Sequence, residues 1–239
     1  VVNFIHGGGD CGALLANDER VRGIFLTGST RAGQALTEIA QQRRVPPILA
    51  LEMGGNSPLV VWDYDSLETA VFIALQSAFI SAGQRCSAAR RLIVRAGDTA
   101  FLDALAQATR RLQVGNPIAE PQPFCGPMIS QTAAQHVLVE QERLVGLGAV
   151  PLVKAELRDS PGGALVAPGL IDVTGVGDVG DEEVFGPLLK LWRVGTFDEA
   201  LDLANATCFG LAAGLVARDR SLYDRFRESI AAGLVNWNQ

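Results

Sequence analysis

The chain has 239 residues, 48% of them hydrophobic, and a formal net charge of −6. This apolar content is enough for a packed core in one large domain or in parts of two, and the acidic balance argues against a general nucleic-acid surface or contact with an acidic membrane. No run approaches the roughly 20 apolar residues of a membrane-spanning helix, and the first residues show neither the basic region nor the cleavage-site pattern of a signal peptide.

Apolar runs and turn residues predict strands that alternate with helices along the chain. Up to residue 52, the predicted order is strand 1–5, helix 11–17, strand 23–27, helix 32–44 and strand 48–52. Strand 58–62, helix 66–82, strand 91–95 and helix 99–113 then lead to a proline-containing loop at 115–128. The remainder is predicted as helix 131–147, strands 150–154, 170–173 and 188–194, helix 197–206, strand 211–216, helix 221–232 and a closing strand within 234–238.

This alternation is typical of an α/β fold with a parallel sheet and βαβ crossovers. We place a domain border between residues 52 and 58, where the glycine-containing segment interrupts two predicted strands. Both ends of the sequence have the pattern of a strand, and an independent domain rarely begins and ends within a sheet. We therefore expect the 239 residues to be an excerpt of a longer polypeptide.

The four cysteines are far apart and form no Cys-x-x-Cys pair, so neither a zinc ribbon nor a disulfide framework is predicted. They are Cys11, Cys86, Cys125 and Cys208. With only two histidines, His6 and His136, we expect no metal site. This composition favours a reduced, cytoplasmic protein.

Cys86 has the sequence context of a nucleophile, because it closes the motif Gly83-Gln84-Arg85-Cys86. A free thiol has an ordinary pKa of about 8.5, and positive surroundings, such as Arg85 or a backbone amide, favour the reactive thiolate. Gly83 lets the chain turn closely enough for a substrate to approach. The alternative is a buried, inert cysteine, which is the state we expect for the other three.

Three further parts of the sequence are candidates for a general base or for dinucleotide binding. Glu52 ends the apolar run at 48–51, so its carboxylate is either poised to move a proton or turned toward water. The turn Gly28-Ser29-Thr30-Arg31-Ala32-Gly33 follows a predicted strand and opens a helix, which presents amide N–H groups to a phosphate. Its spacing is not GxGxxG, so an ordinary turn is the alternative. Glu183 is a candidate for binding ribose hydroxyls. The alternative is that it belongs to a solvated acidic loop.

A cysteine peptidase would need a histidine beside Cys86. His136 lies in the predicted helix 131–147, which has an apolar face, and we assign it to the surface or to packing. We therefore disfavour the peptidase.

Four motifs in order resemble the aldehyde dehydrogenase superfamily over essentially the whole chain. They are FLTGSTRAG (25–33), LEMGGNSPLVV (51–61), GQRCSAARRLIV (83–94) and EEVFGPLL (182–189). The resemblance implies the end of a Rossmann-type cofactor domain over residues 1–52 and an α/β catalytic domain over 53–239. It also implies that much of a complete family member lies outside this sequence, so that the 239 residues alone would be inactive or very poor catalysts.

The resemblance also implies roles for the candidate residues. Cys86 would attack the aldehyde to form a thiohemiacetal, which hydride transfer to NAD converts into a thioester, and Glu52 would activate the water that hydrolyses it. The backbone N–H of Cys86 would contribute to the oxyanion site. The Gly28–Gly33 turn would hold the dinucleotide. Glu183 would hold the nicotinamide ribose, and Phe185 would pack beside the nicotinamide.

Within the superfamily, EMGGN, QSAFISAGQRC (76–86), EPQPF (120–124) and VNWN resemble the N-succinylglutamate 5-semialdehyde dehydrogenases of arginine catabolism. The substrate would then be a small semialdehyde bearing carboxylates, with Arg85, Arg90 and Arg91 as candidates for binding them by charge alone. The family also implies a homo-oligomer. The alternatives are another semialdehyde or general aldehyde dehydrogenase, an inactive fragment that serves as an assembly module, and a cofactor-independent thiol esterase. The choice between NAD and NADP stays open.

Overall fold

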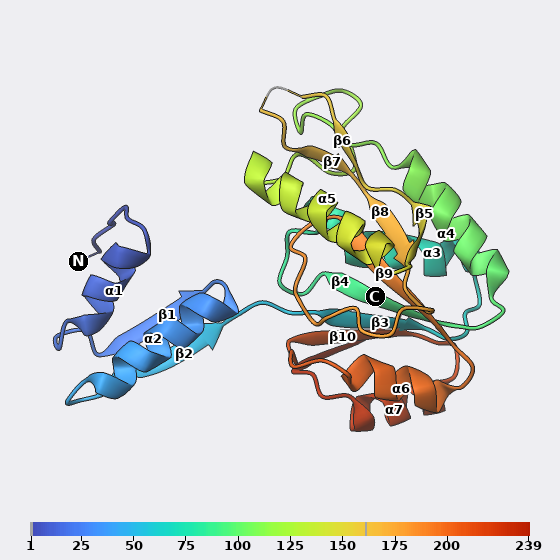
Figure 1. Cartoon of the computed structure of the whole chain (residues 1–239). Helices are drawn as coiled ribbons and strands as arrows, with labels where there is room; N and C mark the ends of the chain where they lie inside the picture. The colour runs from blue at the N-terminus through green and yellow to red at the C-terminus, as the bar shows by residue number, and fades with distance from the viewer. Residues whose placement is uncertain (1, 161) are drawn as a thin grey trace. The chain divides into compact units, whose positions relative to one another are not determined.

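The computed structural model describes residues 2–160 and 162–239 and divides the chain into two compact units, Val1–Gly54 and Gly55–Gln239. Both units are α/β, with helices packed on parallel strands (Figure 1). No helix among the described residues has the length and apolar character needed to cross a membrane.

The first unit has two helices and two parallel strands: α1 (Gly9–Asn17), β1 (Gly23–Thr27), α2 (Thr30–Gln42) and β2 (Ile48–Glu52). β1 and β2 pair in register, with Thr27 opposite Glu52 at their carboxyl ends. Ser29 caps α2, because its hydroxyl accepts a hydrogen bond from the N–H of Ala32 at 3.2 Å. Buried Arg43 donates to the carbonyls of Ala16 and Val21 and so ties α2 to the α1–β1 connection.

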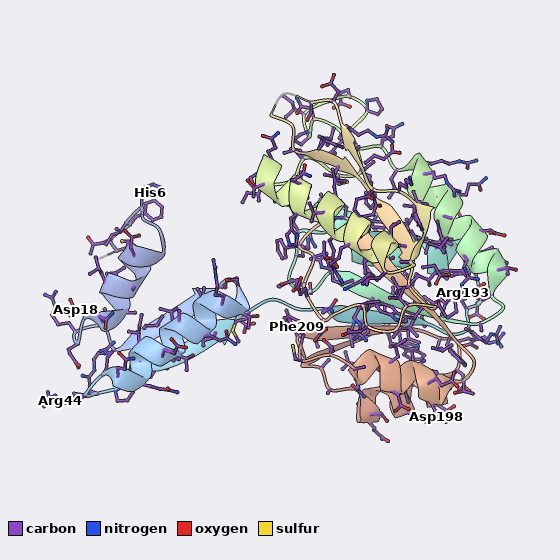
Figure 2. The ribbon with its side chains drawn as sticks, in the orientation of Figure 1. His6, Asp18, Arg44, Arg193, Asp198 and Phe209 are labelled. Atoms are coloured by element: carbon purple, nitrogen blue, oxygen red, sulfur yellow. The ribbon has the colours of Figure 1, made fainter. Side chains whose placement is uncertain are left out.

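The strand predicted at residues 1–5 is wrong for the part that the structure describes. Residues 2–8 have no regular secondary structure, and the side chains of Val2 and Phe4 are 96% and 83% exposed. His6 stands on this irregular segment before α1 (Figure 2). Apolar composition alone suggested a buried strand, but no neighbouring strand pairs with this segment among the described residues.

The second unit is built on a seven-stranded sheet in the order β11-β10-β3-β4-β9-β8-β5. Its strands are β3 (Ser57–Val61), β4 (Ala89–Arg95), β5 (Val150–Val153), β8 (Gly169–Asp172), β9 (Leu188–Val194), β10 (Ala212–Val216) and β11 (Leu234–Trp237). Its α-helices are α3 (Leu67–Phe79), α4 (Thr99–Arg111), α5 (Gln131–Gly146), α6 (Phe197–Asn205) and α7 (Arg220–Ser229). A short turn of 3₁₀ type, η1 (Ile80–Gly83), follows α3.

Helices cover both faces of this sheet (Figure 1). Successive strand residues point to opposite faces, so Leu92 of β4 packs with α3 and α4 while its neighbour Ile93 packs with α6 and α7. α5 covers the second of these faces further along, where it contacts Ile171 and Leu188. The result is a three-layer α/β/α arrangement whose central strands β3, β4 and β9 are largely buried.

The sheet is mixed rather than wholly parallel, because β5 pairs antiparallel with β8 at one edge. A second departure is the two-stranded antiparallel pair β6 (Glu156–Arg158) and β7 (Leu165–Ala167), where no strands were predicted. The helix predicted at 66–82 ends as an α-helix at Phe79. This early end matters for the site, because it frees the residues that lead to Cys86.

Candidate functional site

The approach to Cys86 is a left-handed turn. Ser81, Ala82 and Gly83 have φ values of 57°, 54° and 65°, a conformation that L-residues other than glycine rarely adopt. A Cβ atom added at Gly83 would lie 2.5 Å from the carbonyl oxygen of Gly186. Glycine is therefore required at position 83 both by the backbone conformation and by the close approach of a second chain segment.

Cys86 itself is exposed, which contradicts the alternative of a buried, inert thiol. Its backbone is nevertheless fixed: a Cβ atom at Gly55 would lie 2.7 Å from the carbonyl oxygen of Cys86. Gln84 also anchors the loop, because its side-chain oxygen accepts a hydrogen bond from the N–H of Ile129 at 2.8 Å. The thiol is thus presented to solvent on a well-supported loop, hereafter the Cys86 loop (residues 83–87).

The other cysteines differ from Cys86 in their surroundings. Cys125 is buried, and burial raises the pKa of its thiol to about 11, as expected of an inert cysteine. Cys11 is half-buried. Cys208 is exposed, contrary to the expectation that it is buried, and a hydrogen bond to Asp181 raises the pKa of its thiol.

Glu183 and Phe185 lie on the loop before β9, close to the Cys86 loop in the same unit. The Glu183 side chain is only 17% exposed, so the solvated-loop alternative does not hold for it. Burial raises the pKa of this carboxyl, while a hydrogen bond from the N–H of Gly55 and the charge of Arg90 oppose the shift. Within the described residues, its buried Oε1 has no hydrogen-bond partner. The ring of Phe185 is 44% exposed and offers an apolar surface.

Arg90 connects these two loops and was not predicted to do so. Its side chain is buried, and its guanidinium donates hydrogen bonds to the carbonyls of Gly186 at 3.3 Å and Arg85 at 3.1 Å. It also lies 4.0 Å from the Glu183 carboxylate and 5.4 Å from the centroid of the Phe185 ring. The available signal was a pair of arginines at the start of an otherwise apolar strand.

Asp181 fixes the start of the same loop. Its carboxylate accepts hydrogen bonds from the Asn56 side chain at 2.7 Å, the Thr207 hydroxyl at 2.7 Å and the backbone N–H of Cys208 at 2.6 Å. Burial would raise the pKa of Asp181, but these hydrogen bonds outweigh it and hold the pKa below its ordinary value. Asp181 thereby joins Asn56 to Thr207, two residues before Phe209, which is labelled in Figure 2.

Glu52 and the Gly28–Gly33 turn lie together in the first unit. The carbonyl of Glu52 accepts a hydrogen bond from the N–H of Gly28 at 3.0 Å, so the turn begins beside this carboxylate residue. The Glu52 side chain is exposed, as the alternative of a charge turned toward water also predicted. Gly33 packs against Met53, leaving no room for a side chain unless Met53 moves.

Each of the two groups, taken by itself, has features that suit one part of a dinucleotide. At the start of α2, the amides of Thr30 and Arg31 have no hydrogen-bond acceptor within the described ranges, 2–160 and 162–239, and such amides are suited to a phosphate. In the second unit, the Glu183 side chain is 17% exposed, and a carboxylate can accept a hydrogen bond from a ribose hydroxyl. The exposed ring of Phe185 can pack against a flat ring.

The three arginines that were candidates for binding substrate carboxylates, Arg85, Arg90 and Arg91, have different surroundings in the structure. Arg91 is buried on β4 and donates to the carbonyls of Leu203 and Ala204, and Arg90 is occupied as described above. Neither is therefore free to bind a substrate carboxylate. Arg85 is exposed, and its Nε donates to the Ser81 hydroxyl at 3.1 Å, which leaves its terminal nitrogens toward solvent.

Residues that would indicate metal or peptidase chemistry do not gather here. The described part of the chain has no group of three histidine, cysteine, aspartate or glutamate side chains arranged to hold a metal ion. His136 is exposed on α5, in line with its assignment to the surface.

Comparison with known proteins agrees with these observations. The model of the aldehyde dehydrogenase family matches residues 1–239. N-succinylglutamate 5-semialdehyde dehydrogenase 1 of Caulobacter vibrioides is 47% identical over 241 aligned residues, which cover 100% of this chain and 50% of that protein. The N-succinylglutamate 5-semialdehyde dehydrogenase of Escherichia coli is 45% identical, with 100% and 49% covered. The chain thus spans about half the length of the curated relatives it matches.

Solved structures give the same family. An NAD-dependent aldehyde dehydrogenase from Sinorhizobium meliloti matches with a TM-score of 0.91 and 32% identity, over 98% of this chain and 47% of that one. The betaine aldehyde dehydrogenase of Staphylococcus aureus, solved in complex with NAD+, matches with a TM-score of 0.90 and 27% identity, over 98% and 47%. With a family match over its whole length and relatives of this similarity, the chain belongs to the aldehyde dehydrogenase family.

Proposed function

We propose that the complete protein oxidises N-succinylglutamate 5-semialdehyde to N-succinylglutamate in arginine degradation, with NAD as the oxidant. The observation that carries this proposal is the convergence of an exposed Cys86 with Glu183 and Phe185 on two loops that contact each other at Gly83 and Gly186. The identity of 45–47% to N-succinylglutamate 5-semialdehyde dehydrogenases supports the choice of substrate.

In this mechanism the Cys86 thiolate attacks the aldehyde carbon. The new C–S bond forms as the carbonyl π bond becomes an oxyanion, and the backbone N–H of Cys86 stabilises that charge, a contact worth roughly 3 kcal/mol in other enzymes. NAD, when bound, supplies the acceptor for the hydride that leaves the same carbon. Glu52 then takes a proton from the water that attacks the resulting thioester, and the C–S bond breaks to return the thiolate.

This proposal assigns residues of each unit, considered separately, to a part of the cofactor. The amides of the Gly28–Gly33 turn would bind phosphate, Glu183 the nicotinamide ribose, and Phe185 the nicotinamide ring. On this proposal residues 1–52 form the end of the cofactor domain and residues 53–239 belong to the catalytic domain. We propose NAD rather than NADP because a matched structure, the betaine aldehyde dehydrogenase of Staphylococcus aureus, was solved in complex with NAD+, and we propose homo-oligomer formation from the family alone.

Arg85 is the residue we assign to the carboxylates of the substrate. It is the exposed member of the three arginines near the thiol, and it directly precedes Cys86. Its hydrogen bond to Ser81 restrains the guanidinium through Nε, so that its terminal N–H groups are left to form paired hydrogen bonds with a carboxylate.

The test is NADH formation by the complete gene product with N-succinylglutamate semialdehyde, succinate semialdehyde and a simple aliphatic aldehyde. We expect a strong preference for the first substrate. Cys86→Ala should lower the rate at least about 1,000-fold, whereas Cys208→Ala, at another exposed cysteine, should change it little. Equal rates with all three aldehydes would indicate a general aldehyde dehydrogenase and would contradict the specific substrate.

Two further results would contradict the proposal more deeply. NADH formation that survives Cys86→Ala would overturn the thiol mechanism. Absence of NAD binding by the complete protein would favour an assembly module, and hydrolysis of activated esters without NAD would then indicate a thiol esterase.

A further inference from the structure

Burying the Arg90 side chain costs hydration free energy, and its contacts show that it connects two loops of the second unit. Only 1% of its side chain is exposed, and burial lowers the pKa of its guanidinium to about 10, against the opposing charges of Glu183 and Cys86. It remains a cation at neutral pH. A buried cation is retained only where hydrogen bonds and an opposite charge compensate for its lost hydration.

The hydrogen bonds of Arg90 divide evenly between two segments about 100 positions apart. One terminal nitrogen donates to the carbonyl of Arg85, next to Cys86, and the other donates to the carbonyl of Gly186, at the end of the Glu183–Gly186 segment. The Gly186 carbonyl is also the atom that a Cβ at Gly83 would meet at 2.5 Å. One guanidinium thus joins the two loops beside the point where their backbones meet.

We infer that Arg90 is a positioning residue. It holds Glu183 and Phe185 at a fixed position relative to the Cys86 loop without contacting substrate itself. The inference rests on the proposed function for its meaning, because Glu183 and Phe185 are the residues assigned there to the nicotinamide riboside. Arg90 would then contribute to cofactor binding only through the residues that it positions.

Lysine could not replace Arg90 in this role. The guanidinium is planar and carries several donors in a fixed fork, so it reaches two carbonyls and faces the Phe185 ring at once. A lysine would keep the charge but provide a single donor atom on a flexible chain. Arg90→Lys is therefore expected to release one of the two loops while preserving the electrostatic attraction to Glu183.

Arg91 provides a matched control. It is the next residue of β4, is 3% exposed, and also donates to two backbone carbonyls and faces an aromatic ring, that of Trp192. Because neighbouring strand residues point to opposite faces, its partners Leu203 and Ala204 belong to α6 rather than to the site loops. Arg91→Lys therefore reproduces the cost of altering a buried arginine without touching Glu183.

The first measurement is amide hydrogen exchange of the complete protein without NAD, in wild type, Arg90→Lys and Arg91→Lys. The N–H groups of Ala88 and Leu188 donate to the carbonyls of Arg85 and Gly186, so they report on the two loops. In Arg90→Lys we expect about tenfold faster exchange at the reporter of the loop that is released, the effect of losing one charge-assisted hydrogen bond. In Arg91→Lys we expect faster exchange only around residues 203–207.

The second measurement is the KM for NAD, with a double-mutant cycle. Arg90→Lys should raise KM about tenfold with a smaller change in kcat, and Arg91→Lys should leave KM unchanged. If Arg90 acts through Glu183, Arg90→Lys added to Glu183→Gln should raise KM less than threefold further, because coupled residues are not additive.

These two readouts separate the two proposals. A complete protein that forms no NADH would contradict the proposed function, while the exchange data would still decide the role of Arg90. Unchanged exchange at Ala88 and Leu188 in Arg90→Lys, or faster exchange spread evenly over the second unit, would overturn the positioning role. Equal KM values for Arg90→Lys and Arg91→Lys would do the same in an active enzyme.

Discussion

The Cys86 loop in the second unit touches its neighbours through backbone atoms and buried side chains, whereas the Gly28–Gly33 turn in the first unit depends on local hydrogen bonds. In the Cys86 loop, Gly83 lies against the carbonyl of Gly186, and the carbonyl of Arg85 accepts from the guanidinium of Arg90, whose side chain is buried. Around the turn they are the Ser29 hydroxyl and the Met53 side chain.

The difference shows where each unit tolerates change. A residue that meets backbone transmits any added volume to the elements that carry that backbone, because protein interiors are close-packed. A residue that meets the end of a flexible side chain can be accommodated by a change of rotamer. We therefore expect the Cys86 loop to be sensitive to single methyl groups and the Gly28–Gly33 turn to be tolerant, and the following experiments test this contrast.

Gly83→Ala should have the largest effect, a loss of about 3 kcal/mol in the free energy of unfolding. The new Cβ combines the cost of φ +65° with a clash against the Gly186 carbonyl. Gly97→Ala is the control: Gly97 has φ +91° but nothing within 4 Å of the added Cβ, so only the backbone cost of about 1 kcal/mol remains. Urea unfolding of both variants measures the difference, and equal losses would show that the contact with Gly186 is unimportant.

Lys190→Met should stabilise the second unit at neutral pH. Lys190 is 2% exposed, and burial lowers the pKa of its amine from 10.5 to about 8, with Glu140 and Asp181 opposing the shift and Arg91 and Arg143 adding to it. The unfolded chain holds this proton more tightly, so wild-type stability rises from pH 8 to pH 10.5. The advantage of the variant should be at most about 3 kcal/mol at pH 7.

That advantage should decline across the same window and vanish above pH 10.5. Urea midpoints of wild type and variant from pH 7 to 10.5 provide the comparison. A difference that stays constant with pH would show that Lys190 does not titrate in this range.

Ser29→Ala should cost about 1 kcal/mol by removing the cap of α2. Ser130 caps α5 with the same geometry, accepting from the N–H of Ala133 at 3.1 Å, so Ser130→Ala should lose a similar amount. The two variants should differ in function, because only Ser29 belongs to the turn assigned to the dinucleotide. A several-fold rise in the KM for NAD is expected for Ser29→Ala alone, and equal KM values would separate the turn from cofactor binding.

Gly33→Ala should have the smallest effect, less than about 1 kcal/mol in either direction. The added methyl group displaces Met53, but alanine is favoured over glycine within a helix by nearly 1 kcal/mol. Thermal unfolding is sufficient to test this. A loss as large as that of Gly83→Ala would contradict the contrast between the two regions.

The sequence predicted the α/β class and most elements within a few residues, because long segments such as α4 and β9 have clear periodicity and turn residues at their ends. It could not predict β6 and β7, whose three residues each are too short for a pattern. It misplaced a strand at residues 1–5, since apolar residues there have no partner strand among the described residues. The antiparallel pairing of β5 also depends on long-range contacts that local pattern does not contain.

The candidate site shows the same division between local and distant information. The sequence motifs led to Cys86 and Glu183 as candidates, and the structure places their loops in contact. Arg90 was grouped with its neighbours by charge, because sequence does not reveal which carbonyls a buried guanidinium will reach. The left-handed conformation of Ser81 and Ala82 was likewise hidden, since only Gly83 has the residue type that such a backbone favours.

This left-handed turn also has a consequence for the order of events during synthesis. Each L-residue in this conformation costs roughly 1–2 kcal/mol, so a nascent chain that contains only Ser81 and Ala82 seldom adopts it. Gly186, which packs against the turn, leaves the ribosome about 100 residues later, a delay of roughly 5–20 seconds at ordinary rates of elongation. For that interval the contact between Gly83 and Gly186 cannot form, so the turn before Cys86 lacks the partner that packs against it.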